Sequence, residues 1–253
     1  MNQLQLGVLP HASGSALLKC GGTRILVGVK AELMSADPLF PNSGKIEVSC
    51  NTQSPLFNNL GDDVSAHICS SMNSLLSDGL KESFLESLCV APGRQCWNLY
   101  ADASVLDFDG GLLDCVSMAV YAALANTSIP KIKVLEGNEI EILDGPEDCT
   151  LICVEDIPVF VTLWQVKKRF IIDATSVEEC CSDTSLCVGI NSAGKFCGSH
   201  KRAGRGLHPS QLGQMLQACQ HLGQQRIQRL NAILSLKKQK HHQEQLLEDQ
   251  MLV

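Results

Sequence analysis

The sequence predicts an α+β protein in two similar halves, each with its strands before a helix. Three observations support this prediction. Short apolar or alternating runs, separated by turns, fill the first 51 residues. Two later segments carry apolar residues at helical spacing. After an acidic, turn-rich segment at 137–148, the order of strands followed by a helix occurs a second time.

The first half begins with a pattern that is typical of a sheet. Strands are expected at 4–9, 15–20 and 24–33, and the turns between them contain glycine. Glycine takes up the positive φ that closes a hairpin at little cost. A fourth strand is expected at 46–51, after a turn-forming Pro-Asn-Ser-Gly sequence.

Two helices and one more strand complete the first half. Residues 62–76 place apolar side chains on one helix face, at Val64, Ile68, Met72, Leu75 and Leu76. A strand is expected at 96–106. A second helix is expected at 112–125, where several alanines are small enough to let a sheet or another helix approach closely.

The second half repeats this order. Strands are expected at 150–154, 159–165, 169–173, 185–191 and 196–199. A helix follows from Pro209, since proline suits the first turn of a helix, and it runs into a polar tail. The predicted divisions are a first half, a second half and a polar helical tail, at residues 1–136, 137–235 and 236–253.

The charge balance limits the classes of function. The formal net charge is -7, whereas a freestanding nucleic-acid-binding protein is usually basic. Any contact with RNA is therefore expected to use a local patch or partner proteins. No apolar stretch reaches the roughly 18–20 residues that span a bilayer, so we expect no membrane partner.

The chain has 13 cysteines, and they predict reduced thiols rather than a disulfide framework. The start, MNQLQLGVLP, lacks the basic and apolar regions of a secretory signal, so we expect an intracellular protein. Cys149 and Cys153, the adjacent Cys180 and Cys181, and Cys187 form no paired metal-binding motif with histidines. We therefore expect neither a metal site nor a cofactor.

Three long, collinear strings carry a resemblance to a known family. They are SGSALLKCGGTRILVGVKAE at 13–32, CWNLYADASVLDFDGGLLDCVSMAVYAALANTSIPKIKVLE at 96–136 and IPVFVTLWQVKKRFIIDATSVEE at 157–179. Up to about residue 235 the chain resembles the RNase PH superfamily, and within it the subunits that form the ring of the RNA exosome. The resemblance implies the RNase PH fold (ribosomal protein S5 domain 2-like), with two βαβα-like halves. Such subunits usually begin with extra residues that include an Asp-Gly-Arg segment, and this chain begins near the first core strand, which leaves an N-terminal ring contact open.

Active members of the family degrade RNA by phosphorolysis, in which inorganic phosphate attacks the 3'-terminal linkage. The resemblance implies that a Thr-Arg pair after an Asp-Gly-Gly turn grips this phosphate. Here the turn at 109–111 is followed by Leu112 and Leu113, which offer neither a charge nor a side-chain donor. Asp114 is expected to repel phosphate further. The glycine turn is thus expected to persist as architecture without an anion site.

The first helix also predicts that the cationic groups of an active site are missing. Active relatives carry arginines on the first helix, near the RNA 3' end. Residues 62–76 contain no Lys or Arg, and His67 is the only side chain there that can carry a positive charge.

The acidic segment of the second half is a third test. Residues that match the family's acidic pattern are Asp173, Glu178 and Glu179. The catalytic carboxylate of active members aligns with Thr184 or Ser185, and Asp183 lies one or two residues away. A single carboxylate without a phosphate site would not sustain phosphorolysis, so we expect no catalytic residues and no enzyme.

The resemblance implies a structural subunit that supports 3'-to-5' RNA processing and degradation, including maturation of rRNA and decay of mRNA. Its implied partners are other RNase PH-type subunits, one of which pairs with it within a six-membered ring, an S1/KH cap and RNA in the pore. The implied locations are the nucleus, nucleolus and cytoplasm. Two alternatives remain: an autonomous phosphate-dependent 3'-to-5' exoribonuclease, and a binding module that works outside the exosome.

Candidate RNA contacts come from the basic residues. Lys195, Lys201, Arg202 and Arg205 lie in GKFCGSHKRAGRG, which is expected to form a basic, glycine-rich loop able to approach phosphates. Arg94, in another loop, is a further candidate. A solvated loop or a subunit contact would explain the same pattern. Trp97 and Trp164 lie in apolar strands and are expected in the core or an interface rather than under RNA bases.

Overall fold

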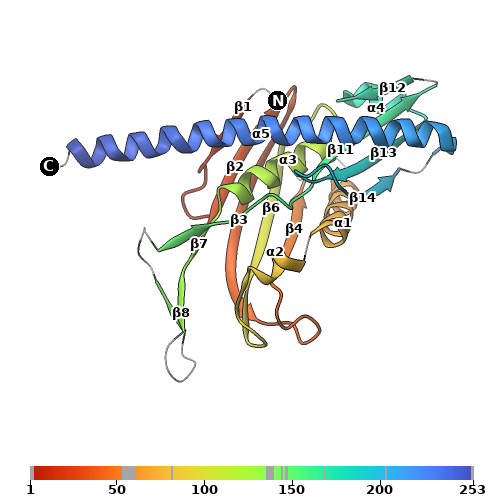
Figure 1. Cartoon of the computed structure of the whole chain (residues 1–253). Coiled ribbons are helices and arrows are strands. Elements are labelled where there is room, and N and C mark those ends of the chain that lie inside the picture. Colours follow the sequence, from red (N-terminus) through yellow and green to blue (C-terminus); the bar gives the residue numbers. More distant parts are fainter. Residues whose placement is uncertain are drawn as a thin grey trace.

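Two sheets, with helices packed between and over them, form the body of the molecule (Figure 1). The computed structural model describes residues 3–52, 61–80, 82–134, 140–143, 145, 148–167, 169–202 and 204–251.

The first half builds a six-stranded sheet. Its strands run in the order β1 (Gln3–Leu6), β2 (Gly14–Cys20), β3 (Thr23–Ser35), β6 (Gln95–Asp107) and β4 (Lys45–Asn51), and β5 (Cys89–Ala91) pairs with the start of β6. All pairings are antiparallel except that of β4 with β6, which is parallel. The expected strands at 15–20, 24–33, 46–51 and 96–106 are confirmed. The first strand ends at Leu6 rather than residue 9, because Gly7 turns the chain with a φ of 66°.

Three helices accompany this sheet, namely α1 (Gly61–Gly79), α2 (Glu82–Glu86) and α3 (Leu112–Ala125). The helices expected at 62–76 and 112–125 are confirmed. Neither α2 nor β5 was predicted, because five and three residues are too few to show a period. In α3 every residue except Leu113 is buried, since the helix packs against β2 and β3 on one side and a strand of the second half, β11, on another.

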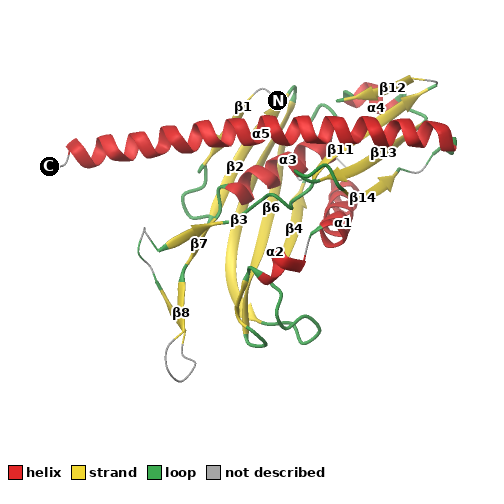
Figure 2. Cartoon of the chain, viewed as in Figure 1, coloured by secondary structure: helices red, strands yellow, loops and turns green. Residues whose placement is uncertain are grey.

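The second half builds an antiparallel sheet in the order β12 (Arg169–Ile172), β11 (Val159–Val166), β13 (Thr184–Ile190) and β14 (Phe196–Lys201). The four strands expected here are confirmed, with bounds that shift by one or two residues. The short helix α4 (Ser176–Cys180) lies between β12 and β13, and the long helix α5 (Pro209–Met251) follows β14. Figure 2 shows α5 lying across the molecule and extending past the sheets towards its C-terminal end.

Two small ladders lie between the halves. β7 (Ser128–Pro130) pairs with β10 (Cys149–Leu151), and β8 (Ile132–Val134) pairs with β9 (Ile140–Ile142). The strand expected at 150–154 is therefore shorter and earlier than expected. The expected boundary at 137–148 lies partly outside the described residues, so the divisions at 136 and 235 stay a prediction.

The core continues from one half into the other through β11. Alternate residues of a strand point to opposite faces. Phe160 belongs to the cluster around α3, whereas Val161 and Leu163 belong to the cluster under α5. Because β11 is buried on both faces, apolar residues occur on both faces of the strand and its sequence does not alternate between apolar and polar residues.

A buried ion pair joins three elements at this point. Asp114 on α3 is only 4% exposed, and both of its carboxylate oxygens accept hydrogen bonds from β11. The donors are the Thr162 amide at 3.0 Å and the Thr162 hydroxyl at 2.5 Å. Arg226 on α5 donates to Oδ2 of Asp114 at 2.5 Å and to the Phe160 carbonyl at 3.0 Å. The Asp114 carboxylate thus points into the core, where Arg226 pairs with it, and the expectation that it repels phosphate at the turn stays a prediction.

Arg226→Met should destabilise the fold strongly. The substitution preserves most of the side-chain volume but leaves the Asp114 carboxylate buried and unpaired, which typically costs about 3–5 kcal/mol. Urea unfolding followed by circular dichroism measures this loss. The matched control is Arg229→Met, three residues further along α5, because Arg229 is exposed and its loss is expected to stay within about 0.5 kcal/mol. Equal stability of the two variants would contradict the role of the ion pair.

Candidate functional site

The glycine turn that precedes α3 is the centre of the candidate site. Gly110 and Gly111 have φ values of 98° and 60°, which favour glycine. A Cβ on Gly110 would come within 2.2 Å of the Ala174 carbonyl oxygen, so no other residue fits there. Thr23 ties the turn to the first sheet, since its hydroxyl donates to the Gly110 carbonyl at 2.8 Å and accepts from the Asp109 amide at 3.0 Å. The turn is a rigid connection between the two halves.

The amide at the start of α3 is occupied by a carboxylate of the chain itself. The Gly111 N–H donates to Oε1 of Glu179 at 2.7 Å. A helix N-terminus attracts anions because its first amides lack partners within the helix. Glu179 is half-buried, and burial raises the pKa of its carboxyl, while the Gly111 N–H and the charge of Arg202 partly oppose that rise. An anion from solution would have to displace Glu179 from this amide.

The residues after the turn provide no positive charge. Leu112 is buried, and Leu113 packs half-buried against the core. The absence of a side-chain donor predicted from the sequence is thus accompanied by apolar packing at both positions. The first turn of α3 contributes backbone amides and apolar contacts to the site.

The neighbouring Glu178 has a different role. Its carboxylate accepts from the Thr175 amide at 2.9 Å, while the Thr175 hydroxyl accepts from the Glu178 amide at 3.4 Å. This reciprocal arrangement is a capping box at the start of α4. The hydrogen bonds from Thr175 lower the pKa of the Glu178 carboxyl. Two adjacent glutamates that match one acidic pattern therefore sit in opposite environments.

The position expected to align with a catalytic carboxylate is buried. Thr184 and Ser185 lie in β13 and are 2% and 4% exposed. Asp183 is exposed, and its carboxylate accepts from the Lys167 amide at 2.8 Å. Lys167 has a φ of 56° in the turn between β11 and β12, so Asp183 stabilises that turn. Asp173 also lies near the glycine turn, with Oδ1 at 3.9 Å from the point where a Cβ on Gly111 would lie.

Helix α1 packs against β14 and brings two histidines together. His67 and His200 have ring centroids 5.1 Å apart. Burial, followed by the charge of His67, lowers the pKa of His200. His200 lies in β14 beside α1, and a neutral imidazole there does not supply the positive charge of the arginines that active relatives carry on this helix.

Three of the five candidate RNA-contacting residues lie together. Lys201 ends β14, and Arg202 and Arg205 follow it; all three are exposed. The Arg202 amide donates to the Ser185 carbonyl at 3.1 Å, and the Arg205 amide donates to the Asp183 carbonyl at 3.2 Å. This group, which we call the basic edge, therefore adjoins the start of β13.

The other two candidates lie elsewhere. Lys195 precedes β14, whose six residues place it roughly 20 Å from Lys201 at about 3.3 Å per residue. Arg94 lies exposed in the turn between β5 and β6, in the first sheet. The expectation of one basic loop from Lys195 to Arg205 is therefore wrong, because the residues between Lys195 and Arg202 form a strand.

Both tryptophans are buried, at 8% for Trp97 and 7% for Trp164. Their expected place in the core is confirmed. Trp164 also lies under Arg202, whose guanidinium carbon is 5.4 Å from the ring centroid. No pattern in the sequence indicates this contact, since the two residues meet only through the pairing of β11, β13 and β14.

The described residues offer few other groups that could bind a metal, enter a membrane or form a disulfide. Among the described residues, no three His, Cys, Asp or Glu side chains gather as metal ligands. No helix within the described ranges has both the length and the apolarity to cross a membrane. All 13 cysteines are free thiols, and six of them are buried. The expected absence of a metal or cofactor stays a prediction.

Comparison with protein-family models identifies the two halves. Residues 2–130 match the 3' exoribonuclease family, domain 1 (RNase_PH), and residues 156–219 match domain 2 of the same family (RNase_PH_C). The chain belongs to the RNase PH family. Its α+β architecture is accordingly the RNase PH fold that the resemblance implied.

Relatives within the RNase PH family agree in sequence and structure. "Exosome complex component Rrp42" of Methanopyrus kandleri is 32% identical over 205 residues, which cover 79% of this chain and 74% of that protein. A structure described as "Archaeal exosome core" matches with a TM-score of 0.74 at 25% identity, over 90% of this chain and 85% of that one. A structure described as "archaeoglobus fulgidus exosome with RNA bound to the active site" matches with a TM-score of 0.73 at 25% identity, over 90% and 87%.

Glu178→Gln and Glu179→Gln should show opposite pH dependence of stability. The lowered pKa of Glu178 means that its contribution is present at neutral pH and is lost as pH falls through that pKa. The raised pKa of Glu179 means that the folded state takes up a proton more readily than the unfolded state, so wild type gains stability as pH falls.

Urea unfolding of wild type and both variants between pH 7 and about pH 3 tests this pair, because the lowered pKa of Glu178 requires the acidic end of this range. Relative to its own variant, wild type should become less stable at low pH in the Glu178 comparison and more stable in the Glu179 comparison. The same sign in both comparisons would contradict the separate environments of the two carboxylates.

Proposed function

We propose that the chain is a non-catalytic structural subunit of an RNA exosome ring that supports 3'-to-5' RNA processing and degradation. The proteins that it resembles support this assignment, since they are described as an exosome component and as exosome cores. The family itself is named for 3' exoribonuclease activity, so the non-catalytic part of the proposal depends on the site.

One observation carries the non-catalytic part: the Gly111 amide, where the phosphate would be held, binds the Glu179 carboxylate instead. Phosphorolysis brings an inorganic phosphate beside a polyanion, which needs cationic donors in the site. Leu113 provides none in the position where active relatives have arginine. Glu179 adds a carboxylate at the same place, which disfavours a second anion.

The proposed partners are other RNase PH-type subunits in a six-membered ring, an S1/KH cap and RNA that passes through the pore. The first sheet ends in β1 and the second sheet in β12, and edge strands are surfaces on which another chain can dock. The β4 edge is partly covered by α1, because the Asn73 side chain hydrogen-bonds both the amide and the carbonyl of Val48. A closed ring requires two such surfaces on each subunit. For RNA, the basic edge of Lys201, Arg202 and Arg205 is the candidate surface in a chain whose net charge is negative.

The proposed locations are the nucleus, the nucleolus and the cytoplasm. They follow from the exosome assignment alone. Fluorescence microscopy of the tagged chain in its own cells tests them.

Affinity purification of the tagged chain from its own cells tests the assignment. Mass spectrometry should identify other RNase PH-type subunits in the purified material, and RNA decay by that material should not depend on phosphate. Absence of such subunits would contradict the ring assignment. The alternative, a phosphate-dependent 3'-to-5' exoribonuclease, requires that the purified chain alone releases nucleoside diphosphates from RNA when phosphate is added.

Arg205→Gln and Lys201→Gln should weaken RNA binding by the assembled complex. Each neutralised phosphate contact lowers the dependence of log Kd on log salt by about 0.7 for single-stranded RNA. Fluorescence anisotropy with a labelled single strand at several salt concentrations measures this slope. Lys195→Gln is the matched control, because this lysine is equally exposed but lies at the other end of β14. An equal loss in all three variants would contradict the basic edge as the contact surface.

A further inference from the structure

Two cysteines face each other across a short hairpin outside the candidate site. Cys89 in β5 and Cys96 in β6 are directly opposed in an antiparallel ladder. Directly opposed residues place their side chains on the same face of a sheet. Both residues are free thiols, Cys89 half-buried and Cys96 only 1% exposed. The strand pairing therefore brings two thiols side by side.

The hydrogen bonds of the hairpin set the distance between the two cysteines. The Trp97 amide donates to the Leu88 carbonyl at 2.8 Å, so Leu88 and Trp97 occupy the place of a hydrogen-bonded pair, although the Leu88 amide donates to Leu85. In an antiparallel ladder, such pairs alternate with pairs that lack these bonds. Cys89 and Cys96 form the next pair and hence a non-hydrogen-bonded one, in which the Cα atoms lie about 4.5 Å apart. That separation falls within the roughly 4.4–6.8 Å that a disulfide spans.

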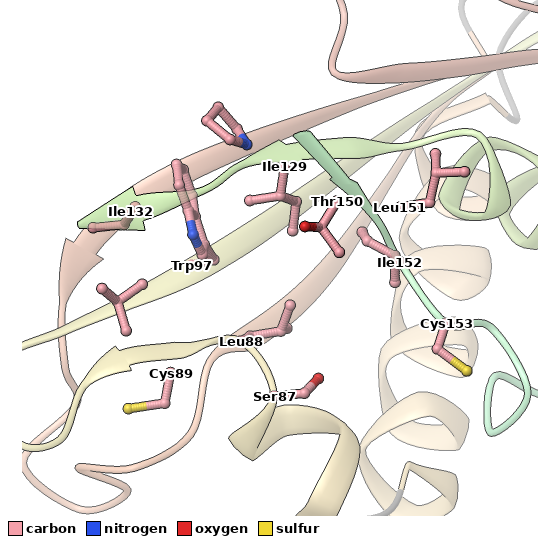
Figure 3. Close-up of a pocket in the computed structure, with 12 residues that line it drawn as sticks. Ser87, Leu88, Cys89, Trp97, Ile129, Ile132, Thr150, Leu151, Ile152 and Cys153 are labelled. Carbon is pink, nitrogen blue, oxygen red and sulfur yellow. The ribbon is translucent and has the colours of Figure 1, made fainter. Parts of the chain in front are cut away.

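Cys89 is the more accessible of the two thiols. It lines a cavity of about 480 Å³, together with Trp97, Ile129 and Cys153 among others. Figure 3 shows Cys89 and Cys153 on opposite sides of this cavity. Burial, followed by the contact with Cys89, raises the pKa of Cys96 to about 11, so Cys96 stays a thiol at neutral pH. A small oxidant that enters the cavity therefore meets Cys89 first.

We propose that Cys89 and Cys96 form a reversible disulfide when the protein meets hydrogen peroxide or a related hydroperoxide. Disulfides in intracellular proteins are usually transient and redox-sensing, and the Cα separation expected for this pair, about 4.5 Å, lies within the range that a disulfide spans.

The reaction takes place in two steps. The Cys89 sulfur attacks one peroxide oxygen, the O–O bond breaks, and one water leaves as Cys89 becomes a sulfenic acid. The Cys96 sulfur then attacks the Cys89 sulfur, the S–O bond breaks, and a second water leaves as the S–S bond forms. Two thiols are oxidised, and one hydrogen peroxide is reduced to two waters; an organic hydroperoxide would give one alcohol and one water instead. A dithiol reductant reverses the change by thiol–disulfide exchange.

The disulfide would stiffen a segment that holds a neighbouring loop. The closed segment is 89–96, and its turn accepts and donates hydrogen bonds to the loop between β3 and β4. Ala36 donates to the Arg94 carbonyl at 2.8 Å, and Gly93 donates to the Pro41 carbonyl at 2.8 Å. Oxidation would thus restrain the turn that presents Arg94.

Peptide mapping of the purified full chain tests the proposal. The protein is treated with hydrogen peroxide, its remaining thiols are blocked with N-ethylmaleimide, and it is digested with trypsin. Cleavage after Lys81, Arg94 and Lys131 places Cys89 in the peptide 82–94 and Cys96 in the peptide 95–131. The expected product is these two peptides linked by a disulfide that dithiothreitol removes. Fragment spectra distinguish a link at Cys96 from one at Cys115 in the same peptide.

Variants provide the controls. The link should disappear in Cys89→Ser and persist in Cys153→Ser, which removes the other thiol of the cavity. Because the wild-type map alone identifies the link, the test does not depend on whether a Cys96 variant folds. Peroxide treatment that leaves Cys89 and Cys96 unlinked, or that joins Cys89 to Cys153, would overturn the proposal.

Discussion

The buried carboxylate of Asp114 sets a condition that three elements must meet together. A charge that is only 4% exposed is costly unless it is paired and hydrogen-bonded, so α3, β11 and α5 can pack only in the arrangement that brings Thr162 and Arg226 to it. This arrangement fixes α3 against both halves of the chain. The position of α3 in turn fixes the glycine turn at its start, and with it the candidate site.

In the proposed non-catalytic role, the site keeps the architecture of a phosphate cradle without its chemistry. The turn at 109–111 retains its left-handed glycines and its tie to Thr23, because they connect the two halves whether or not an anion binds. The amide of Gly111 still needs an acceptor, and Glu179 supplies it from the second half. The fold needs this turn whether or not phosphate binds there. A member of the RNase PH family can therefore keep the turn and serve as a ring subunit.

Outside that site, the charged and reactive side chains with a proposed role lie at the ends of strands. The basic edge follows β14, and the Cys89–Cys96 pair closes the hairpin of β5 and β6. Both features arise from strand pairing, which places residues from separate strands side by side. A ring subunit would use its strand edges for assembly, so the features that remain open to ligands lie where strands end.

The sequence by itself determined the α+β class, most strands, both long helices of the first half and the apolar residues after the glycine turn, because periodicity and residue type are local properties. It did not show the direction of Asp114, because only the packing of α3 against β11 shows which way that carboxylate points. It also grouped Lys195 with Arg202, although the strand between them separates the two. The contacts of Glu179 with Gly111 and of Arg202 with Trp164 were decided by tertiary structure alone, since they join residues far apart in the sequence, whose approach no local pattern encodes.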